Sequence, residues 1–220
     1  MPRWLKNNGL LLVNAGLFVV FLGGMVVSGA SAYNDDQLTH GQQPVSIFGY
    51  LQTGQFVEAV FENWESEFLQ MAMYVVLTIF LFQKGSSESK PIGKKAAQDE
   101  DPRKAEISPN TPWPVRKGGW ILVVYEHSLS SLLVILFIGS ILMHATGGAA
   151  AYSEEQLAHG MPAVSTWEFM ATSEFWFESF QNWQSEFLAV AVLVGASVFL
   201  RERGSPESKP VAEPHHETGA

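Results

Sequence analysis

An internal repeat is the feature that most constrains the fold of this 220-residue chain. Residues 33–91 and 152–210 align without a gap at an offset of 119 residues, and 26 of the 59 aligned positions are identical. The identical positions include the segment Asn-Trp-x-Ser-Glu-Phe-Leu, which begins at Asn63 and again at Asn182. Duplication of one unit is the simplest origin of such a pattern. The sequence therefore predicts two halves that fold alike.

Four apolar runs divide the chain, and polar, acidic segments separate them. A membrane-spanning helix needs about 20 mostly apolar residues. We expect four such helices, two in each half, at about 10–31, 63–83, 128–147 and 181–201. The first run has an alternative interpretation as a secretory signal, because Ala30-Ser31-Ala32 is typical of a cleavage site. The run is longer than the usual apolar part of a signal, so we favour a retained helix.

The repeat and the local composition define the domains. We predict a first two-helix repeat at 1–91 and a second at 120–210, with external segments at 33–62 and 152–181. Residues 92–119, rich in Ser, Pro, Lys and Asp, are expected to form a flexible cytoplasmic linker. A disordered tail is expected at 211–220.

Cap residues predict short helices in both external segments. Asn34 and Ser46 are suited to begin a helix, and Ser165 with Glu168 has the spacing of a capping box. The Gly-Ser-x-Glu-Ser-Lys-Pro segments, which begin at 85 and 204, are typical of a helix end with glycine in the left-handed region. Both motifs follow the second apolar run of their half.

The placement of cationic residues predicts an orientation in the membrane. All 13 Lys and Arg lie before residue 10, between 84 and 117, or after 200, whereas 31–67 and 146–186 contain only acidic charges, six each. Cationic flanks stay on the cytoplasmic side, so we expect both termini and the linker inside and the acidic segments outside. The predicted fold class is an all-α membrane protein with four transmembrane helices. Its parallel repeats would be related by a pseudo-twofold axis along the membrane normal.

Composition excludes several classes of function. Without cysteine, the chain has no disulfide, thiolate metal site, iron–sulfur cluster or cysteine nucleophile. Its net charge of −9 argues against nucleic acid as a partner. The sequence also lacks a Gly-rich phosphate loop, a nucleophile elbow and a His-Glu-x-x-His motif. We therefore expect no catalytic residue, metal or cofactor and favour a protein that is not an enzyme.

A polar stripe in each half is the first candidate site. Its members recur at i, i+3 and i+4, so they share one helix face at the membrane boundary. The six residues are Asn63, Ser66, Glu67, Asn182, Ser185 and Glu186. If the twofold axis brings the two stripes together, Glu67 and Glu186 would form a proton or cation site. The alternative, which we favour, is that these side chains cap neighbouring polar segments in the headgroup layer.

Three histidines are secondary candidates. His40 and His159 occupy equivalent positions, each before a glycine, and the last turn of a helix favours a histidine there. We favour this structural role over a ligand role for both. His144 lies inside the third apolar run, where a polar side chain is a functional candidate, and its counterpart in the first half is Met25.

The motifs in combination are distinctive. They are Tyr-x-(Asp/Glu)-(Asp/Glu)-Gln-Leu-x-His-Gly from Tyr33 and Tyr152, the Asn-Trp-x-Ser-Glu-Phe-Leu segments, and the Gly-Ser-x-Glu-Ser-Lys-Pro segments. Together they resemble an uncharacterised family of small bacterial membrane proteins that carries a domain-of-unknown-function label. The resemblance covers nearly the whole chain and implies a location in the bacterial inner (cytoplasmic) membrane. It implies no activity, substrate or catalytic residue.

Three hypotheses for the function follow. We favour a non-enzymatic scaffold, partner subunit or envelope-stress component, with the lipid bilayer and a homodimer or another membrane protein as partners. The first alternative is a small proton or cation transporter or channel that uses the duplicated stripe. The second alternative, which ranks last, is a haem- or quinone-binding membrane protein.

Overall fold

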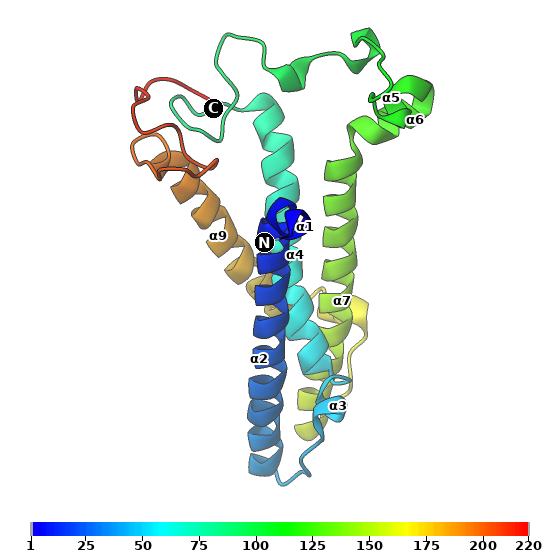
Figure 1. The fold of residues 1–220 in the computed structure, drawn as a ribbon. Helices are drawn as coiled ribbons and strands as arrows, with labels where there is room; N and C mark the ends of the chain where they lie inside the picture. Colours follow the sequence, from blue (N-terminus) through cyan, green and yellow to red (C-terminus); the bar gives the residue numbers. More distant parts are fainter. Residues whose placement is uncertain (1, 220) are drawn as a thin grey trace. The chain divides into compact units, whose positions relative to one another are not determined.

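The computed structural model describes residues 2–219, which form helices joined by turns and loops (Figure 1). The long helices are α2 (Gly9–Thr39), α4 (Gly54–Phe80), α7 (Ser128–Ala158) and α9 (Ser173–Ala196). Shorter elements are α1 (Arg3–Asn7), α3 (Ile47–Tyr50), η1 (Ala97–Asp99), η2 (Pro102–Lys104), α5 (Trp113–Lys117), α6 (Gly119–Glu126) and α8 (Thr166–Phe169). The predicted all-α class is confirmed for this part of the chain.

Internal contacts group the chain into two compact units. The first unit contains Met1–Phe61 and Met143–Phe175, and the second contains Glu62–Leu142 and Trp176–Ala220. Helices α4, α7 and α9 each continue from one unit into the other. Each of these three helices therefore contributes residues to both units.

The first unit contains the same aromatic cluster twice. Tyr50 lies between Tyr33 and Phe56, with ring centroids 5.7 and 5.4 Å away. The equivalent residues of the second repeat, Tyr152, Phe169 and Phe175, have centroid distances of 5.6 and 5.7 Å. Tilted and edge-on aromatic pairs at such distances stabilise a core. These two aromatic triads show that the sequence repeat is also a structural repeat.

Glycines in α2 and α7 make room for the central ring of each triad. A Cβ atom on Gly29 would lie 2.3 Å from the Tyr50 hydroxyl oxygen, and one on Gly148 would lie 2.3 Å from Phe169 Cε1. Gly54 permits a third close approach, because its Cβ would lie 2.5 Å from the backbone nitrogen of Ala151. The start of α4 therefore packs directly on the backbone of α7.

The prediction that Asn34 begins a helix is wrong, because α2 passes through it without interruption. The Asn34 side chain instead bonds the returning loop: its Oδ1 accepts from the Val45 amide over 2.7 Å, and its Nδ2 donates to the Val45 carbonyl over 2.9 Å. Ser153 holds Val164 in the same way. The helix stops only near Gly41, whose φ of +72° lies in the left-handed region.

The short helices predicted after Ser46 and Ser165 are present as α3 and α8. The Ser46 hydroxyl accepts a hydrogen bond from the amide of Gly49 over 3.1 Å. Ser165 accepts from the amide of Glu168 over 3.3 Å, and Glu168 Oε2 accepts from the amide of Ser165 over 2.7 Å. The predicted capping box is therefore complete in α8.

In the second unit, α4 and α9 end before the Gly-Ser-x-Glu-Ser-Lys-Pro segments. Gly85 has a φ of +87°, but it lies in a turn beyond the helix and is not the helix cap. The Ser89 hydroxyl accepts from the amide of Gln83 over 3.1 Å, and Ser208 accepts from Glu202 over 2.9 Å. In both repeats the motif therefore forms a turn whose serine hydroxyl bonds a backbone amide six residues earlier. The prediction of a helix end did not include this turn.

The predicted linker carries short helical turns and ion pairs. Lys90 contacts Asp99 over 2.6 Å, and the Arg103 guanidinium binds both carboxylate oxygens of Glu126 over 2.8 and 3.1 Å. Asp99 and Arg103 are exposed, and an exposed ion pair contributes little to stability. They join Lys90 to η1 and η2 to the end of α6.

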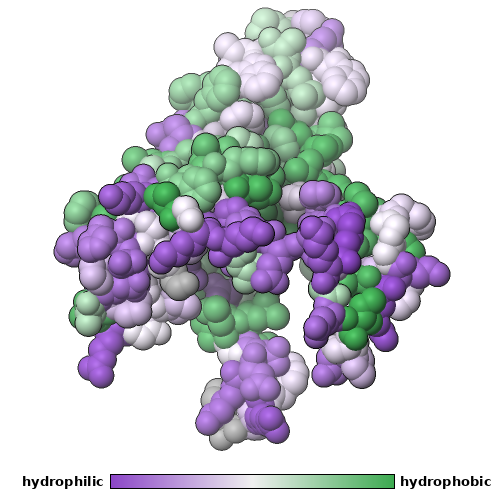
Figure 2. Space-filling model, turned by 90° about the horizontal axis from the view of Figure 1, so that it is seen from above, coloured by the Kyte–Doolittle hydropathy of each residue, from purple (hydrophilic) through white to green (hydrophobic). Residues whose placement is uncertain are grey.

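Helices α2 and α7 are long and apolar enough to cross a membrane. None of the apolar stretch of α2 and only 17% of that of α7 is buried. Apolar surface is also exposed on the molecular face drawn in Figure 2, next to polar surface. Two of the four predicted spans are therefore helices of the required kind, and the assignment of α4 and α9 as spans stays a prediction.

Candidate functional site

The two polar stripes lie on α4 and α9 within the second unit, and their serines serve their own helices. The Ser66 hydroxyl donates to the carbonyl of Asn63, and the Ser185 hydroxyl donates to the carbonyl of Asn182, both over 2.8 Å. Ser66 is buried, whereas Asn63 and Ser185 are exposed. Both serine hydroxyls thus donate to backbone carbonyls of their own helices. This leaves the carboxylates and Asn182 as the polar groups of the stripes to consider further.

Glu67 lies on α4 and Glu186 on α9, the two helices that carry the polar stripes. Gln70 Nε2 donates to the backbone carbonyl of Glu186 over 3.0 Å, so α4 contacts α9 at this level. Glu186 is half-buried, whereas Glu67 is exposed. Two carboxylates close together would favour the uptake of a proton or a cation by one of them. The contact between the helices is therefore shown, and the pairing of the two carboxylates stays a prediction.

Two further carboxylates belong to the same contact between α4 and α9. Glu65 is fully buried, and its Oε1 accepts a hydrogen bond from Trp183 Nε1 over 3.0 Å. Glu62 Oε1 accepts a short hydrogen bond from Asn182 Nδ2. A buried carboxylate is expensive unless it is hydrogen-bonded, paired or protonated. The α4–α9 contact therefore concentrates four carboxylates, of which Glu65 is the most deeply placed.

The secondary candidates His40 and His159 occupy equivalent, exposed positions in the first unit. His40 Nδ1 lies 3.0 Å from the carbonyl oxygen of Asp36, and His159 Nδ1 lies 2.9 Å from that of Glu155. Each histidine is thus bonded to its own helix one turn back. This arrangement matches a structural role at the helix end.

The comparison with protein families identifies the chain at the level of a family. The profile described as "Domain of unknown function (DUF6766)" matches residues 1–220. The chain belongs to the DUF6766 family. No curated protein and no solved structure matches it. Because the family description names no activity, the function of this DUF6766 chain has to be argued from its residues.

Sequence reasoning missed Glu62 and Glu65 because the polar stripes were defined by the positions that both repeats share. Their counterparts in the DUF6766 chain are Gln181 and Gln184, so the two halves differ in charge where they meet. A carboxylate in one repeat with a side-chain amide at the equivalent position of the other is a sequence signal for a contact between the repeats. The reason is that an amide can donate a hydrogen bond to a carboxylate without adding charge. The Asn182–Glu62 bond is of this kind.

Proposed function

We propose that this DUF6766 protein is an integral membrane protein that binds and passes protons or small cations at the carboxylates of α4 and α9. The observation that supports the proposal is the hydrogen bond from Gln70 Nε2 to the backbone carbonyl of Glu186, which holds α4 and α9 together at the level of Glu67 and Glu186. A carboxylate pair relieves its repulsion by holding one proton or one cation. Exchange of that ion is the elementary step of transport.

The membrane assignment is supported by α2 and α7. A core helix of a soluble protein would be mostly buried, and the apolar stretches of these two helices are not. All Lys and Arg lie outside residues 31–67 and 146–186. In the proposed topology α2, α4, α7 and α9 cross the bacterial inner membrane, both termini and the linker are cytoplasmic, and the acidic segments are external.

The charge distribution suits a cation rather than an anion. The segments 31–67 and 146–186 carry six acidic residues each and no basic residue. A surface of one sign concentrates counter-ions near it. Four helices leave little room for a pore inside one chain, so a homodimer is the proposed working form.

Flux into proteoliposomes tests the proposal. Vesicles that contain the protein and a pH-sensitive dye are subjected to proton, Na⁺ and K⁺ gradients. Glu67→Gln and Glu186→Gln remove the charges of the pair and should each lower the flux at least tenfold. Glu155→Gln is the matched control, because Glu155 is an exposed carboxylate of an acidic segment. Flux that is equal in all four proteins would reject the carboxylate pair as the ion site.

A second candidate function, as a scaffold or partner subunit, is favoured by two exposed aromatic side chains. Phe48 on α3 and Trp167 on α8 occupy equivalent repeat positions and are 79% and 73% exposed. Large exposed apolar groups of this kind often mark contact surfaces. The proposed partner is another membrane protein. Purification from native membranes should recover it in stoichiometric amount with the wild type and lose it with Phe48→Ser and Trp167→Ser together.

A further inference from the structure

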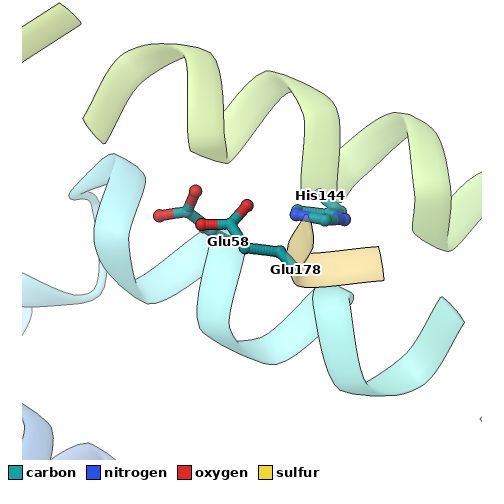
Figure 3. A group of neighbouring side chains, drawn as sticks. All are labelled: Glu58, His144 and Glu178. Atoms are coloured by element: carbon teal, nitrogen blue, oxygen red, sulfur yellow. The ribbon is translucent and has the colours of Figure 1, made fainter. Parts of the chain in front are cut away.

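Apart from Glu65, two ionisable side chains of residues 2–219 are fully buried: His144 in the first unit and Lys209 in the second. The His144 ring stacks on Phe175, with centroids 4.9 Å apart and planes inclined by 30°. Figure 3 shows this ring on α7 and the Glu58 carboxylate on α4. The stacking accounts for the burial of His144 in the aromatic core of its unit. Lys209 lies in a different environment, in which backbone carbonyls surround its charge.

The C-terminal tail, residues 211–219, covers the ammonium group of Lys209. Its Nζ donates three hydrogen bonds over 2.9 to 3.2 Å. The acceptors are the backbone carbonyls of Pro214, His215 and Glu217. Arg201 binds the same tail, since its Nη2 donates to the backbone carbonyl of Glu213 over 3.3 Å. The tail therefore contacts both cations through carbonyl groups, which are neutral.

Neither cation forms an ion pair with a carboxylate in the described part of the chain. Arg201 Nη1 donates to the carbonyl of Ser197 over 3.0 Å, and its buried Nε has no hydrogen-bond partner within the described residues. Burial, followed by the charge of Arg201, lowers the pKa of Lys209. The carboxylates of Glu213 and Glu217 oppose this shift only in part. A buried charge without a paired anion is costly, so this arrangement needs an explanation.

The first repeat shows that the motif does not require such a pair of cations. Lys90 is the counterpart of Lys209, and its Nζ lies 2.6 Å from Asp99 and 5.8 Å from the centroid of the Phe82 ring. An aromatic ring and a carboxylate both stabilise an ammonium group. The counterpart of Phe82 is Arg201. The second repeat thus has a further cation where the first has a ring that attracts one.

A pocket of about 750 Å³ adjoins Lys209 and provides space for a ligand. It is lined by residues 202–206 and 208–211 of the same turn. These residues include Arg203, which is exposed, and a single carboxylate, Glu202. With Arg201, which precedes the turn, the positive charges around Lys209 outnumber the negative charge of the pocket. Such a surface attracts anions.

We propose that Arg201 and Lys209 bind a phosphate group, which displaces the carbonyls of residues 213–217. Phosphate oxygens carry negative charge and accept hydrogen bonds from guanidinium and ammonium groups at once, which makes them stronger partners than neutral carbonyls. In the proposed topology this turn is cytoplasmic, where the headgroups of anionic lipids carry phosphate. The membrane location is taken from the proposed function, whereas ion flux plays no part in this site.

Titration of the full chain in detergent with lipid and with inorganic phosphate tests the site. Native mass spectrometry counts bound phosphatidylglycerol, and phosphatidylcholine, whose headgroup has no net charge, is the reference. We expect one phosphatidylglycerol per chain, bound about tenfold more tightly than phosphatidylcholine. This preference would assign the phosphate to a lipid headgroup. Calorimetric binding of inorganic phosphate without a preference between the lipids would assign it to a soluble compound. Absence of both would overturn the proposal.

Lys209→Gln and Lys90→Gln form a matched pair, because each removes one positive charge at the same position of the repeated motif. Lys209→Gln should weaken binding about tenfold or more, since a hydrogen bond to a charged group is lost. Lys90→Gln should leave binding unchanged, because Lys90 is paired with Asp99. Arg201→Phe installs the residue of the first repeat and should weaken binding as Lys209→Gln does. Equal losses in the two lysine variants would mean general attraction by positive charge and would overturn the site.

Hydrogen exchange in the wild type tests the displacement of the tail and needs no variant. The amides of His215, His216 and Glu217 should exchange about tenfold faster when phosphatidylglycerol or phosphate is bound, and should be unchanged with phosphatidylcholine. Circular dichroism reports whether the variants fold, and if they do not, the exchange experiment decides. Exchange that stays the same with every ligand would overturn the proposal. Glu67 and Glu186 are untouched throughout, so phosphate binding and ion flux can fail separately.

Discussion

The hydroxyl of Tyr33 donates a hydrogen bond to Glu154 Oε1 over 3.0 Å, and this bond joins residues 121 positions apart. Gln37 Nε2 donates to the same oxygen over 3.2 Å. The counterpart of Glu154 in the first repeat is Asp35, which is exposed. In the first unit these two hydrogen bonds to Glu154 link the two repeats. Asp35, at the equivalent position, does not repeat the arrangement.

Tyr33→Phe removes one donor from the Glu154 carboxylate and keeps the aromatic ring. A hydrogen bond to a charged group contributes about 1.5–3 kcal/mol when buried, and this site is half-buried, so we expect the free energy of unfolding to fall by about 1–2 kcal/mol. Thermal or denaturant unfolding in detergent measures the change. Tyr152→Phe is the control, because the hydroxyl of Tyr152 has no hydrogen bond within residues 2–219. An equal loss in both variants would contradict the role of the bond.

Gly148→Ala places a methyl group where Phe169 Cε1 and Glu58 Oε1 already lie. Overpacking of this kind costs about 1–3 kcal/mol, so we expect a lower melting temperature. Gly139→Ala in the same helix has open space around its Cβ and should stabilise the protein by up to about 1 kcal/mol, because alanine is the better helix former. A parallel thermal melt of both variants checks the opposite signs. Two shifts of the same sign would show that α7 moves to accept the methyl group.

The capping box of α8 should make stability depend on pH. Hydrogen bonds from the Ser165 amide and hydroxyl to the Glu168 carboxylate lower the pKa of Glu168 below its usual value. Its contribution is therefore fully present above the unfolded pKa of about 4.3 and is lost as the pH falls through the lower pKa of the folded state. Glu168→Gln keeps the hydrogen-bonding shape and removes the titration.

Melting temperatures measured between pH 3 and pH 6 test this linkage. The difference between wild type and Glu168→Gln should shrink as the pH falls. The other repeat supplies an internal comparison, since the helix that begins after Ser46 has Gly49 at the corresponding position and no carboxylate to titrate. A difference that stays constant over this range would mean that the carboxylate charge contributes nothing to the cap.

Trp183→Phe removes the indole donor from the buried carboxylate of Glu65. Loss of one hydrogen bond to a buried charged group should lower the free energy of unfolding by about 1–3 kcal/mol. A double-mutant cycle with Glu65→Gln isolates the pair, and we expect a coupling energy of about 1–2 kcal/mol. Trp120→Phe, at a tryptophan that is 76% exposed, is the control. A coupling energy near zero would assign the loss to packing of the ring.

The repeated features were the part of the fold that the sequence made predictable. Residues at the same offset in both halves became the aromatic triads, and the serine caps at 46 and 165 were correct because a cap depends on three or four consecutive residues. Asn34 was wrong for the opposite reason. Its side chain bonds Val45, eleven residues away, and a local pattern contains no information about such a partner.

The candidate sites were predicted only in part. The sequence indicated Glu67, Glu186 and His144 as candidates because each is a polar residue in apolar surroundings. Glu62 and Glu65 did not, because both lie in a segment where acidic residues are frequent and their counterparts are glutamines. The close approach of α4 to α7 at Gly54 and Gly147 was not predicted either. Backbone proximity of this kind is a property of packing, which hydrophobic periodicity does not specify.

Each aromatic triad is complete within 33–56 or within 152–175. The linker between the halves can therefore be cut without dividing either cluster. We expect the two halves, made as separate polypeptides in one cell, to reassemble through the Tyr33–Glu154 bond and the Gly54–Ala151 contact. In that form the junction between the halves would be an interface between two polypeptides, whereas in the single chain it is internal.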